Sequence, residues 1–179
     1  MEDKEILTKI REKEYRETGF SLLVKKYQQR IYWHIRKMVI DHDDADDILQ
    51  EVFIKVWKGI DKFREDSSLY TWIYRIATHE SLNYLNRKRR RSMFSLDDVN
   101  QELSRKLDQS SHIDGTEIQM KLQKALLKLP DKQRLVFNMK YFDDMKYEEI
   151  SAITDTSVGG LKASYHHAVK KIEEYLTRD

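Results

Sequence analysis

The chain has 179 residues, which is enough for one domain or two small ones. Five glycines and one proline exclude a β-sandwich or barrel, and 40% apolar residues exclude wholesale disorder. The chain contains no cysteine, which excludes a disulfide framework, a thiolate zinc site and a cysteine nucleophile, and its net charge is only +2. The composition therefore predicts an all-helical chain.

Charge is distributed unevenly along the chain. Residues 1–91 carry a net charge of +4, residues 92–115 a net charge of −3 and residues 116–179 a net charge of +1. The middle segment is rich in Ser, Asp and Gln and has weak hydrophobic periodicity. We therefore expect an all-α fold of two small helical domains, 1–91 and 116–179, joined by a flexible linker over 92–115. No stretch approaches the ~18 apolar residues of a membrane span, and the charged N-terminus lacks a signal-peptide core, so a cytoplasmic protein is expected.

The first two predicted helices lie on either side of an aspartate cluster. Apolar residues spaced three and four apart predict a helix over residues 20–39. Five aspartates between residues 41 and 47 predict the start of the next helix, because a helix N-terminus favours negative charge and its unpaired N–H groups donate hydrogen bonds to a capping carboxylate. Gln50 and Glu51 point away from the apolar face of this second helix.

A loop over residues 63–68 leads to a third predicted helix over residues 69–91. Outside its apolar stripe lie Tyr74, Arg75, His79 and Asn83, followed by a basic run that contains Arg87, Lys88, Arg89 and Arg90. Rings and amides beside cations suit single-stranded nucleic acid, because bases stack on rings and guanidinium groups neutralise phosphates. The basic run is also compatible with a solvated helix end or a nuclear-import patch, and an aromatic such as Trp72 is more often core than platform.

The last segment predicts a helix-turn-helix. Pro130 ends one helix, Asp131 is placed to cap the next, and Ser157 is placed to cap the last. In this motif the second helix enters the major groove of DNA by its N-terminal end. The outward residues of the last helix are Gly159, Gly160, Lys162, Ala163, His166, His167 and Lys170. Each glycine costs a helix about 1 kcal/mol against alanine, which a close approach of backbone to DNA would justify and a frayed first turn would also explain.

Metal chemistry is weakly supported by the sequence. Adjacent His166 and His167 diverge by about 100° on a helix and cannot chelate one metal from one face, so a base or phosphate contact, or simple exposure, is favoured. His34, His42 and Asp43 superficially resemble the His-Asp pair of helical metal phosphohydrolases, but no further set completes a ligand shell. We expect no catalytic residue, no metal and no cofactor.

Three stretches together resemble the sigma factors of bacterial RNA polymerase. The stretch DDADDILQEVFIKVWKGIDKF is similar to the second conserved region, and LYTWIYRIATHESLNYLNRKRRR is similar to its helix that melts and reads the minus-ten promoter element. The stretch LPDKQRLVFNMKYFDDMKYEEISAITDTSVGGLKASYHHAVKKIEEYL resembles the fourth region, which binds the minus-thirty-five element. With only these two regions and a short linker, the chain resembles the extracytoplasmic-function (ECF) subgroup.

The resemblance implies roles for individual residues. The residues implied to face the coiled coil of the polymerase clamp are Asp47, Gln50 and Glu51. The residues implied to cradle a flipped base are Phe63, Arg64, Ser67 and Ser68, and those implied to line the opened strand are Tyr74, Arg75, His79 and Asn83, with the basic run beyond them. Ser157 and the outward residues of the last helix would read the minus-thirty-five element. The family often has Asn in place of His79, and basic or hydroxyl residues in place of Gly160, Ala163 and His167, so promoter sequence does not transfer from relatives.

The implied function is that of a reversible specificity subunit. Such a protein binds core RNA polymerase and promoter DNA, and the polymerase performs the chemistry, so the chain itself is not expected to be an enzyme. An anti-sigma factor is a common further partner in this family. A stand-alone DNA-binding regulator explains the helix-turn-helix equally well, but not the aromatic and basic third helix or the acidic second one.

Overall fold

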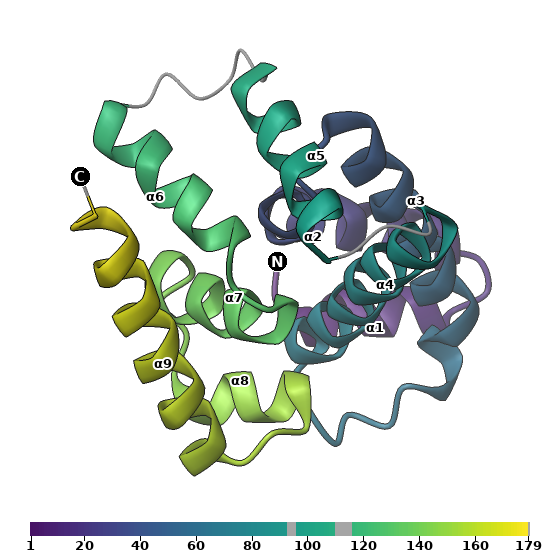
Figure 1. The fold of residues 1–179 in the computed structure, drawn as a ribbon. Coiled ribbons are helices and arrows are strands. Elements are labelled where there is room, and N and C mark those ends of the chain that lie inside the picture. Colours follow the sequence, from purple (N-terminus) through teal and green to yellow (C-terminus); the bar gives the residue numbers. More distant parts are fainter. Residues whose placement is uncertain (93–95, 110–115, 179) are drawn as a thin grey trace.

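The computed structural model describes residues 1–92, 96–109 and 116–178, and every regular element within these ranges is helical, as the composition predicts. In chain order (Figure 1) the elements are α1 (Asp3–Arg11), α2 (Arg16–Val39), α3 (His42–Gly59), the short 3-10 helix η1 (Ile60–Lys62), α4 (Leu69–Ser92), α5 (Leu96–Gln109), α6 (Glu117–Leu127), α7 (Asp131–Phe137), the π-helical turn η2 (Asn138–Phe142), α8 (Tyr147–Thr154) and α9 (Val158–Leu176). Within the described ranges, no helix is both long and apolar enough to cross a membrane.

Helices α2, α3 and α4 form the centre of the first domain, and each packs against the other two. The aspartate cluster starts α3 as predicted, because Asp41 Oδ1 accepts a hydrogen bond from the backbone N–H of Asp44 at 3.0 Å. Only two residues separate α2 from α3, and Ile40 between them has a φ of 67°, which a β-branched residue rarely adopts. This abrupt reversal brings the apolar faces of α2 and α3 together.

Helix α1 is an element that the sequence analysis did not predict. Its Ile6, Leu7 and Ile10 are buried, although charged residues surround them in the sequence. The helix packs along α2 at a place where Gly19 allows a close approach. A Cβ atom at Gly19 would lie 2.8 Å from the backbone nitrogen of Ile10, so any side chain there would force the two helices apart.

The segment 92–115, expected to be a flexible linker with weak periodicity, contains helix α5. Its buried residues recur every four positions: Val99, Leu103 and Leu107. Lys106 on the same helix forms ion pairs with Asp41 and Asp44, at 3.1 and 3.4 Å. The expectation of weak periodicity over residues 96–109 is therefore wrong, because the many polar residues between the three apolar side chains obscured a regular spacing.

Helices α6 to α9 form the second domain. The turn between α8 and α9 places Asp155 at a φ of 53°, and Ser157 Oγ then caps α9 as predicted by accepting a hydrogen bond from Gly160 N at 3.1 Å. These two helices are the predicted helix-turn-helix. The predicted cap at Asp131 is wrong: Pro130 occupies the N-cap position of α7, and Asp131 is the first helical residue. The Asp131 carboxylate is instead directed to Arg89, a contact described below.

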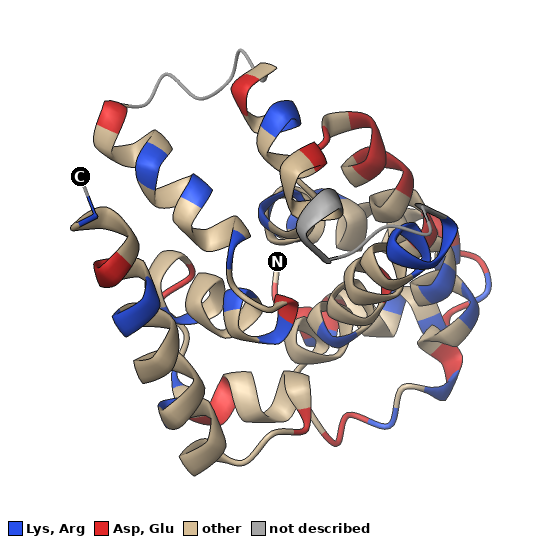
Figure 2. Ribbon diagram, in the orientation of Figure 1, with Lys and Arg blue, Asp and Glu red and all other residues tan. Residues whose placement is uncertain are grey.

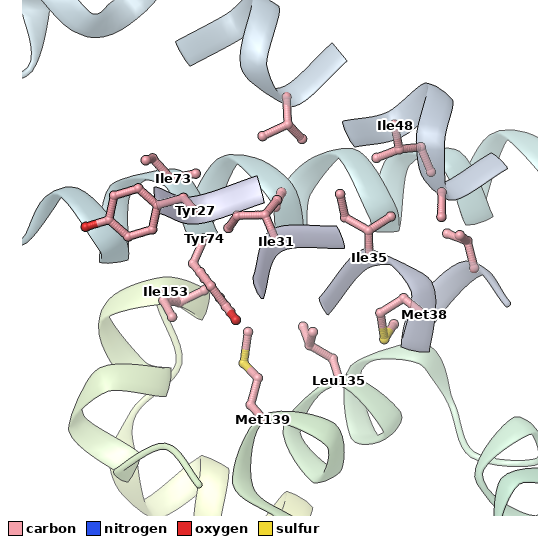
Figure 3. Packing of buried hydrophobic residues seen from close by; sticks show 14 of the residues in the cluster. Tyr27, Ile31, Ile35, Met38, Ile48, Ile73, Tyr74, Leu135, Met139 and Ile153 are labelled. Atoms are coloured by element: carbon pink, nitrogen blue, oxygen red, sulfur yellow. The ribbon is translucent and has the colours of Figure 1, made fainter. Parts of the chain in front are cut away.

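The two domains contact each other, chiefly through α4 and α8 with a smaller contact between α2 and α7. One buried cluster contains Met38 and Tyr74 from the first domain and Leu135, Met139 and Ile153 from the second. Figure 3 shows these side chains converging between the domains. A smaller core lies between α6, α7 and α9 of the second domain. The relative placement of the domains does not follow from the sequence, and the structure gives it.

Candidate nucleic-acid and polymerase interface

The outer face of α4 carries polar side chains that are spaced one helical turn apart. Arg75, His79, Asn83 and Arg87 occupy successive positions four residues apart. The last three are exposed, as is Arg90 beyond them, while Arg75 is partly exposed. Figure 2 shows Lys and Arg gathered at the end of this helix. The predicted outward orientation of these residues is confirmed, and their contact with DNA stays a prediction.

Two cations of the basic run are turned toward other parts of the protein. Lys88 Nζ lies 3.0 Å from Glu102 Oε1 of α5. Arg89 Nη1 lies 2.5 Å from Asp131 Oδ2 of α7, so this arginine is part of the boundary between the domains. A phosphate could bind at these two positions only by replacing a carboxylate.

Tyr74 does not share the outer face of α4. Its side chain is 2% exposed, and its ring centroid lies 4.4 Å from that of Tyr70 and 4.7 Å from that of His34. Burial, and then the neighbouring Tyr70 hydroxyl, raises the pKa of Tyr74. The expectation that Tyr74 faces outward is wrong for this structure, because α2 and the second domain cover that side of α4.

The histidines and the aspartate of the metal-enzyme alternative are not brought together. His34 is fully buried, and its Nε2 forms a hydrogen bond with Thr78 Oγ1 at 2.8 Å. Burial, and then the charge of Lys37, lowers the pKa of His34 to about 3. His42 is exposed and its Nδ1 forms a hydrogen bond with the Tyr32 hydroxyl at 2.6 Å. No group of three His, Asp or Glu side chains within residues 1–92, 96–109 and 116–178 has the geometry to hold a metal ion.

The loop before α4 is fixed at both ends and exposed in between. Phe63 is buried, with its ring centroid 5.0 Å from that of the partly buried Trp72, which therefore serves as core. Ser68 Oγ accepts a hydrogen bond from a backbone N–H in the first turn of α4 at 3.1 Å. Arg64 and Ser67 between these anchors are exposed. The loop thus presents Arg64 and Ser67, together with the exposed acids Glu65 and Asp66, on a fixed base.

The acidic residues of α3 share a groove with α4. Asp47, Gln50 and Glu51 are exposed, as predicted. Asp47 and Glu51 line the groove from α3, and Tyr84 and Arg87 line it from α4. Figure 2 shows the acidic start of α3 close to the basic end of α4. The residues predicted to bind polymerase therefore adjoin a residue predicted to bind DNA.

The polar contacts that hold this groove together were not predicted from the sequence. Lys55 Nζ donates a hydrogen bond to Glu80 Oε1 at 2.6 Å, and the Tyr84 hydroxyl donates one to Asp44 Oδ2 at 2.5 Å. Burial, and then the hydrogen bond to Asp44, raises the pKa of Tyr84. The partners are 25 and 40 residues apart in the chain, so no local spacing could have revealed them.

The outward face of α9 matches the predicted set. Its exposed residues are Gly159, Gly160, Lys162, Ala163, His166, His167 and Lys170. A Cβ atom at Gly160 would lie 3.1 Å from Ser157 Oγ, so the capping contact favours glycine there. A Cβ atom at Gly159 would meet nothing within 4 Å. The fold itself gives no reason for a glycine at position 159.

Comparisons with known proteins match both domains. Residues 23–91 match the family Sigma-70 region 2, and residues 119–172 match Sigma-70, region 4. The ECF RNA polymerase sigma-E factor of Escherichia coli (strain K12) is 32% identical over 163 residues, covering 87% of this chain and 85% of the relative. The chain belongs to the ECF sigma factors. The RNA polymerase sigma-H factor of Pseudomonas aeruginosa is 29% identical, covering 98% of this sigma factor and 94% of the relative.

Two solved structures share the fold of this sigma factor. The sigma factor RpoE in complex with the anti-sigma factor NepR from Bartonella quintana has a TM-score of 0.67 at 20% identity, covering 89% of this chain and 98% of that one. CnrH in complex with the cytosolic domain of CnrY has a TM-score of 0.66 at 23% identity, covering 91% and 90%. We refer below to residues 23–91 as region 2 and to residues 119–172 as region 4.

Proposed function

We propose that this sigma factor binds core RNA polymerase in the cytoplasm and directs initiation at its own set of promoters, with α9 reading the minus-thirty-five element and α4 melting the minus-ten element. The observation that carries the proposal is the presence, in one chain, of the polar line on α4 and the exposed face of α9. A stand-alone regulator needs only the second of these. The chain supplies recognition, and bond formation belongs to the polymerase.

At the minus-ten element, α4 has the chemistry to hold unpaired DNA. His79 and Asn83 present hydrogen-bonding groups that can pair with base edges, and Arg87 and Arg90 extend the same line with charges for phosphates. Unstacking a base costs a few kcal/mol, which such contacts offset. Region 2 thereby favours the opened strand over the duplex.

At the minus-thirty-five element, α9 offers a helix end suited to the major groove. Its first turn contains Gly159, a position where the fold has room for a Cβ atom. The absence of a side chain there lets the backbone approach DNA closely. Lys162 and His166 follow one turn apart and are exposed. The positive end of the helix dipole adds attraction for phosphates.

The exposed acids of α3 are the proposed polymerase contact. Asp47, Gln50 and Glu51 combine two carboxylates and an amide on one turn, a surface that suits a basic helical partner. The two structural neighbours are complexes with an anti-sigma factor and with a cytosolic domain of another protein. An anti-sigma factor is accordingly proposed as a further partner of this chain.

Run-off transcription with bacterial core polymerase on a genomic fragment library tests the proposal. We expect discrete start sites that require this protein. The double variant His79→Ala/Asn83→Ala should lose permanganate-reactive thymines at those starts, and Lys162→Ala/His166→Ala should lose binding upstream of them. Glu173→Gln, an exposed change about three turns beyond Lys162 toward the end of α9, should retain both signals. Absence of start sites, together with no co-migration with core polymerase on gel filtration, would overturn the proposal in favour of a simple DNA-binding regulator.

A further inference from the structure

We infer that Arg11, at the end of α1, is a positioning residue for minus-ten recognition, because it holds Glu65 in the loop over residues 63–68. This loop is called the minus-ten loop below. The inference rests on the proposed function and on the role that the family resemblance implies for the loop, which is to cradle a flipped base. Arg11 lies before residue 23, where the match to Sigma-70 region 2 begins, so the matched region does not include it.

The minus-ten loop contains a residue in a strained backbone conformation. Glu65 has a φ of 62°, in the left-handed region that favours glycine. A residue with a Cβ atom adopts this conformation at a cost in free energy, so it persists where contacts with the surrounding structure fix it. Arg64 and Ser67, two exposed side chains implied to contact the base, lie within two positions of Glu65. The backbone direction at Glu65 therefore determines where these two side chains point.

Arg11 provides such a contact from a distant part of the chain. It is the last residue of α1, and its Nη2 donates a hydrogen bond to Glu65 Oε1 at 2.6 Å, across 54 residues of sequence. The two side chains are 53% and 43% exposed. An ion pair with this exposure contributes little to the stability of a fold. We therefore expect the pair to affect the conformation of the minus-ten loop and to leave the stability of region 2 nearly unchanged.

The segment just before the minus-ten loop is also held by an arginine from the N-terminal part of the chain. Arg16 Nη1 and Nη2 donate hydrogen bonds to Asp61 Oδ1 and Oδ2, at 2.6 and 2.9 Å. The Arg16 guanidinium group lies 4.6 Å from the centre of the Trp57 ring. Two parallel hydrogen bonds fix the relative orientation of both groups. The loop therefore begins from a fixed segment, where Phe63 also packs on Trp72.

Helix α1 is itself fixed, so it can support the loop. Ile6, Leu7 and Ile10 bury its apolar face against α2. The close approach of the two helices at Gly19 leaves no room for a Cβ atom, which would lie 2.8 Å from the backbone nitrogen of Ile10. Arg11 follows Ile10 directly in the chain, so its backbone is attached to a packed position. The ion pair to the minus-ten loop therefore starts from the core of the first domain.

A mobility measurement tests whether Arg11 holds the loop. The chain has no cysteine, so Ser67→Cys carries a single nitroxide label in the minus-ten loop. Arg11→Gln and Glu65→Gln should each increase the mobility of this label, seen as sharper lines in the electron paramagnetic resonance spectrum. Lys26→Gln is the matched control, because it removes a pair of the same 2.6 Å length between α2 and Asp3 of α1. The control should leave the spectrum unchanged.

A binding measurement tests whether the held loop recognises a base. The probe is the single-stranded minus-ten oligonucleotide of a start site found by run-off transcription, either intact or with an abasic site at one position in turn. The ratio of the two dissociation constants, measured with the complex of core polymerase and the unchanged chain, identifies the base that the loop holds. Arg11→Gln and Glu65→Gln should lower this ratio at least threefold, whereas Lys26→Gln and the conservative Arg11→Lys should lower it less than twofold.

The two glutamine variants change the net charge in opposite directions, which separates positioning from general electrostatics. Removing the negative charge of Glu65 would by itself strengthen DNA binding, and removing the positive charge of Arg11 would weaken it. A lower ratio in both variants therefore reports the lost pair. An unchanged label mobility or an unchanged ratio in Arg11→Gln would overturn the inference and leave the proposed function intact. Absence of start sites would refute the proposed function and leave the mobility result standing by itself.

Discussion

The two helices proposed to face DNA, α4 and α9, differ in how much of their surface the protein itself uses. Helix α9 packs on α6, α7 and α8 with one side and exposes the other. Helix α4 packs on α2 and α3 and also contacts α8 and α5. When a helix packs on one side only, its apolar periodicity identifies the exposed face. When a helix is contacted on several sides, periodicity does not identify that face. This difference explains why every residue predicted to face outward on α9 is exposed, whereas Tyr74 of the set predicted on α4 is buried.

The largest expected effect comes from the covered side of α4. Tyr74→Ala should lower the free energy of unfolding by about 3–5 kcal/mol, the range for removing a buried aromatic side chain. His166→Ala on the exposed face of α9 should change it by no more than about 0.5 kcal/mol. Urea unfolding followed by circular dichroism measures both. If Tyr74→Ala cost less than about 1 kcal/mol, the helix would not be covered as described.

The next effect is a pH dependence of the free energy of unfolding, which comes from His34, a buried residue beside α4. His34 has a pKa of about 3 in the folded chain against 6.5 when unfolded, because burial disfavours its charged form. Between these values the unfolded state binds the additional proton, so stability present above pH 6.5 is lost as the pH falls. The slope should be about 1.4 kcal/mol per pH unit.

Urea unfolding of the chain and of His34→Gln between pH 7 and pH 4 measures this contribution. The variant should be less stable at pH 7 and should show a shallower decline. Burial disfavours the charged form of Asp41, but its hydrogen bonds to Asp44 and Lys106 outweigh burial and lower its pKa below 3.8. The stability that Asp41 contributes is therefore lost chiefly below pH 3.8, outside the range of this comparison. If the free energy of unfolding of both proteins declined equally with pH, protonation of His34 would not be the cause of the pH dependence.

A smaller effect is expected on the exposed face of α9. Lys162→Ala should weaken binding of a promoter duplex containing the minus-thirty-five element about tenfold, or roughly 1.4 kcal/mol, without changing stability. Lys171→Ala on the same helix is the matched control, because Lys171 is directed to Gln133 at 3.3 Å. Fluorescence anisotropy at fixed salt gives both affinities. Equal losses for the two variants would indicate a general charge effect in place of a reading face.

The smallest effect concerns the glycine that the fold does not require. Gly159→Ala should raise the free energy of unfolding by up to about 1 kcal/mol, because alanine favours a helix and its Cβ meets nothing within 4 Å. Gly160→Ala should gain less, since its Cβ would lie 3.1 Å from Ser157 Oγ. Thermal unfolding orders the two variants. If Gly159→Ala is stabilised and binds promoter duplex as well as the unchanged chain, no close backbone approach to DNA occurs there.

Local patterns in the sequence determined most of the helical fold. Asp41 before α3 and Ser157 before α9 each accept a hydrogen bond from the residue three positions later, so these capping contacts follow from the sequence alone. The exposed faces of α3 and α9 followed in the same way from helical periodicity. Where polar residues outnumbered a regular apolar spacing, as in α1 and α5, composition masked a pattern that was present.

Only the tertiary structure decided which side of α4 is covered. The sequence by itself determined most of the helices, the helix-turn-helix and most of the candidate residues on their outer faces, because these depend on neighbours within a few turns. It did not determine the burial of Tyr74 or the partners of Arg75 and Arg89, which depend on residues between 40 and 80 positions away in the chain. Periodicity records whether a side chain is apolar, and it carries no information about a second surface that folds back onto the helix.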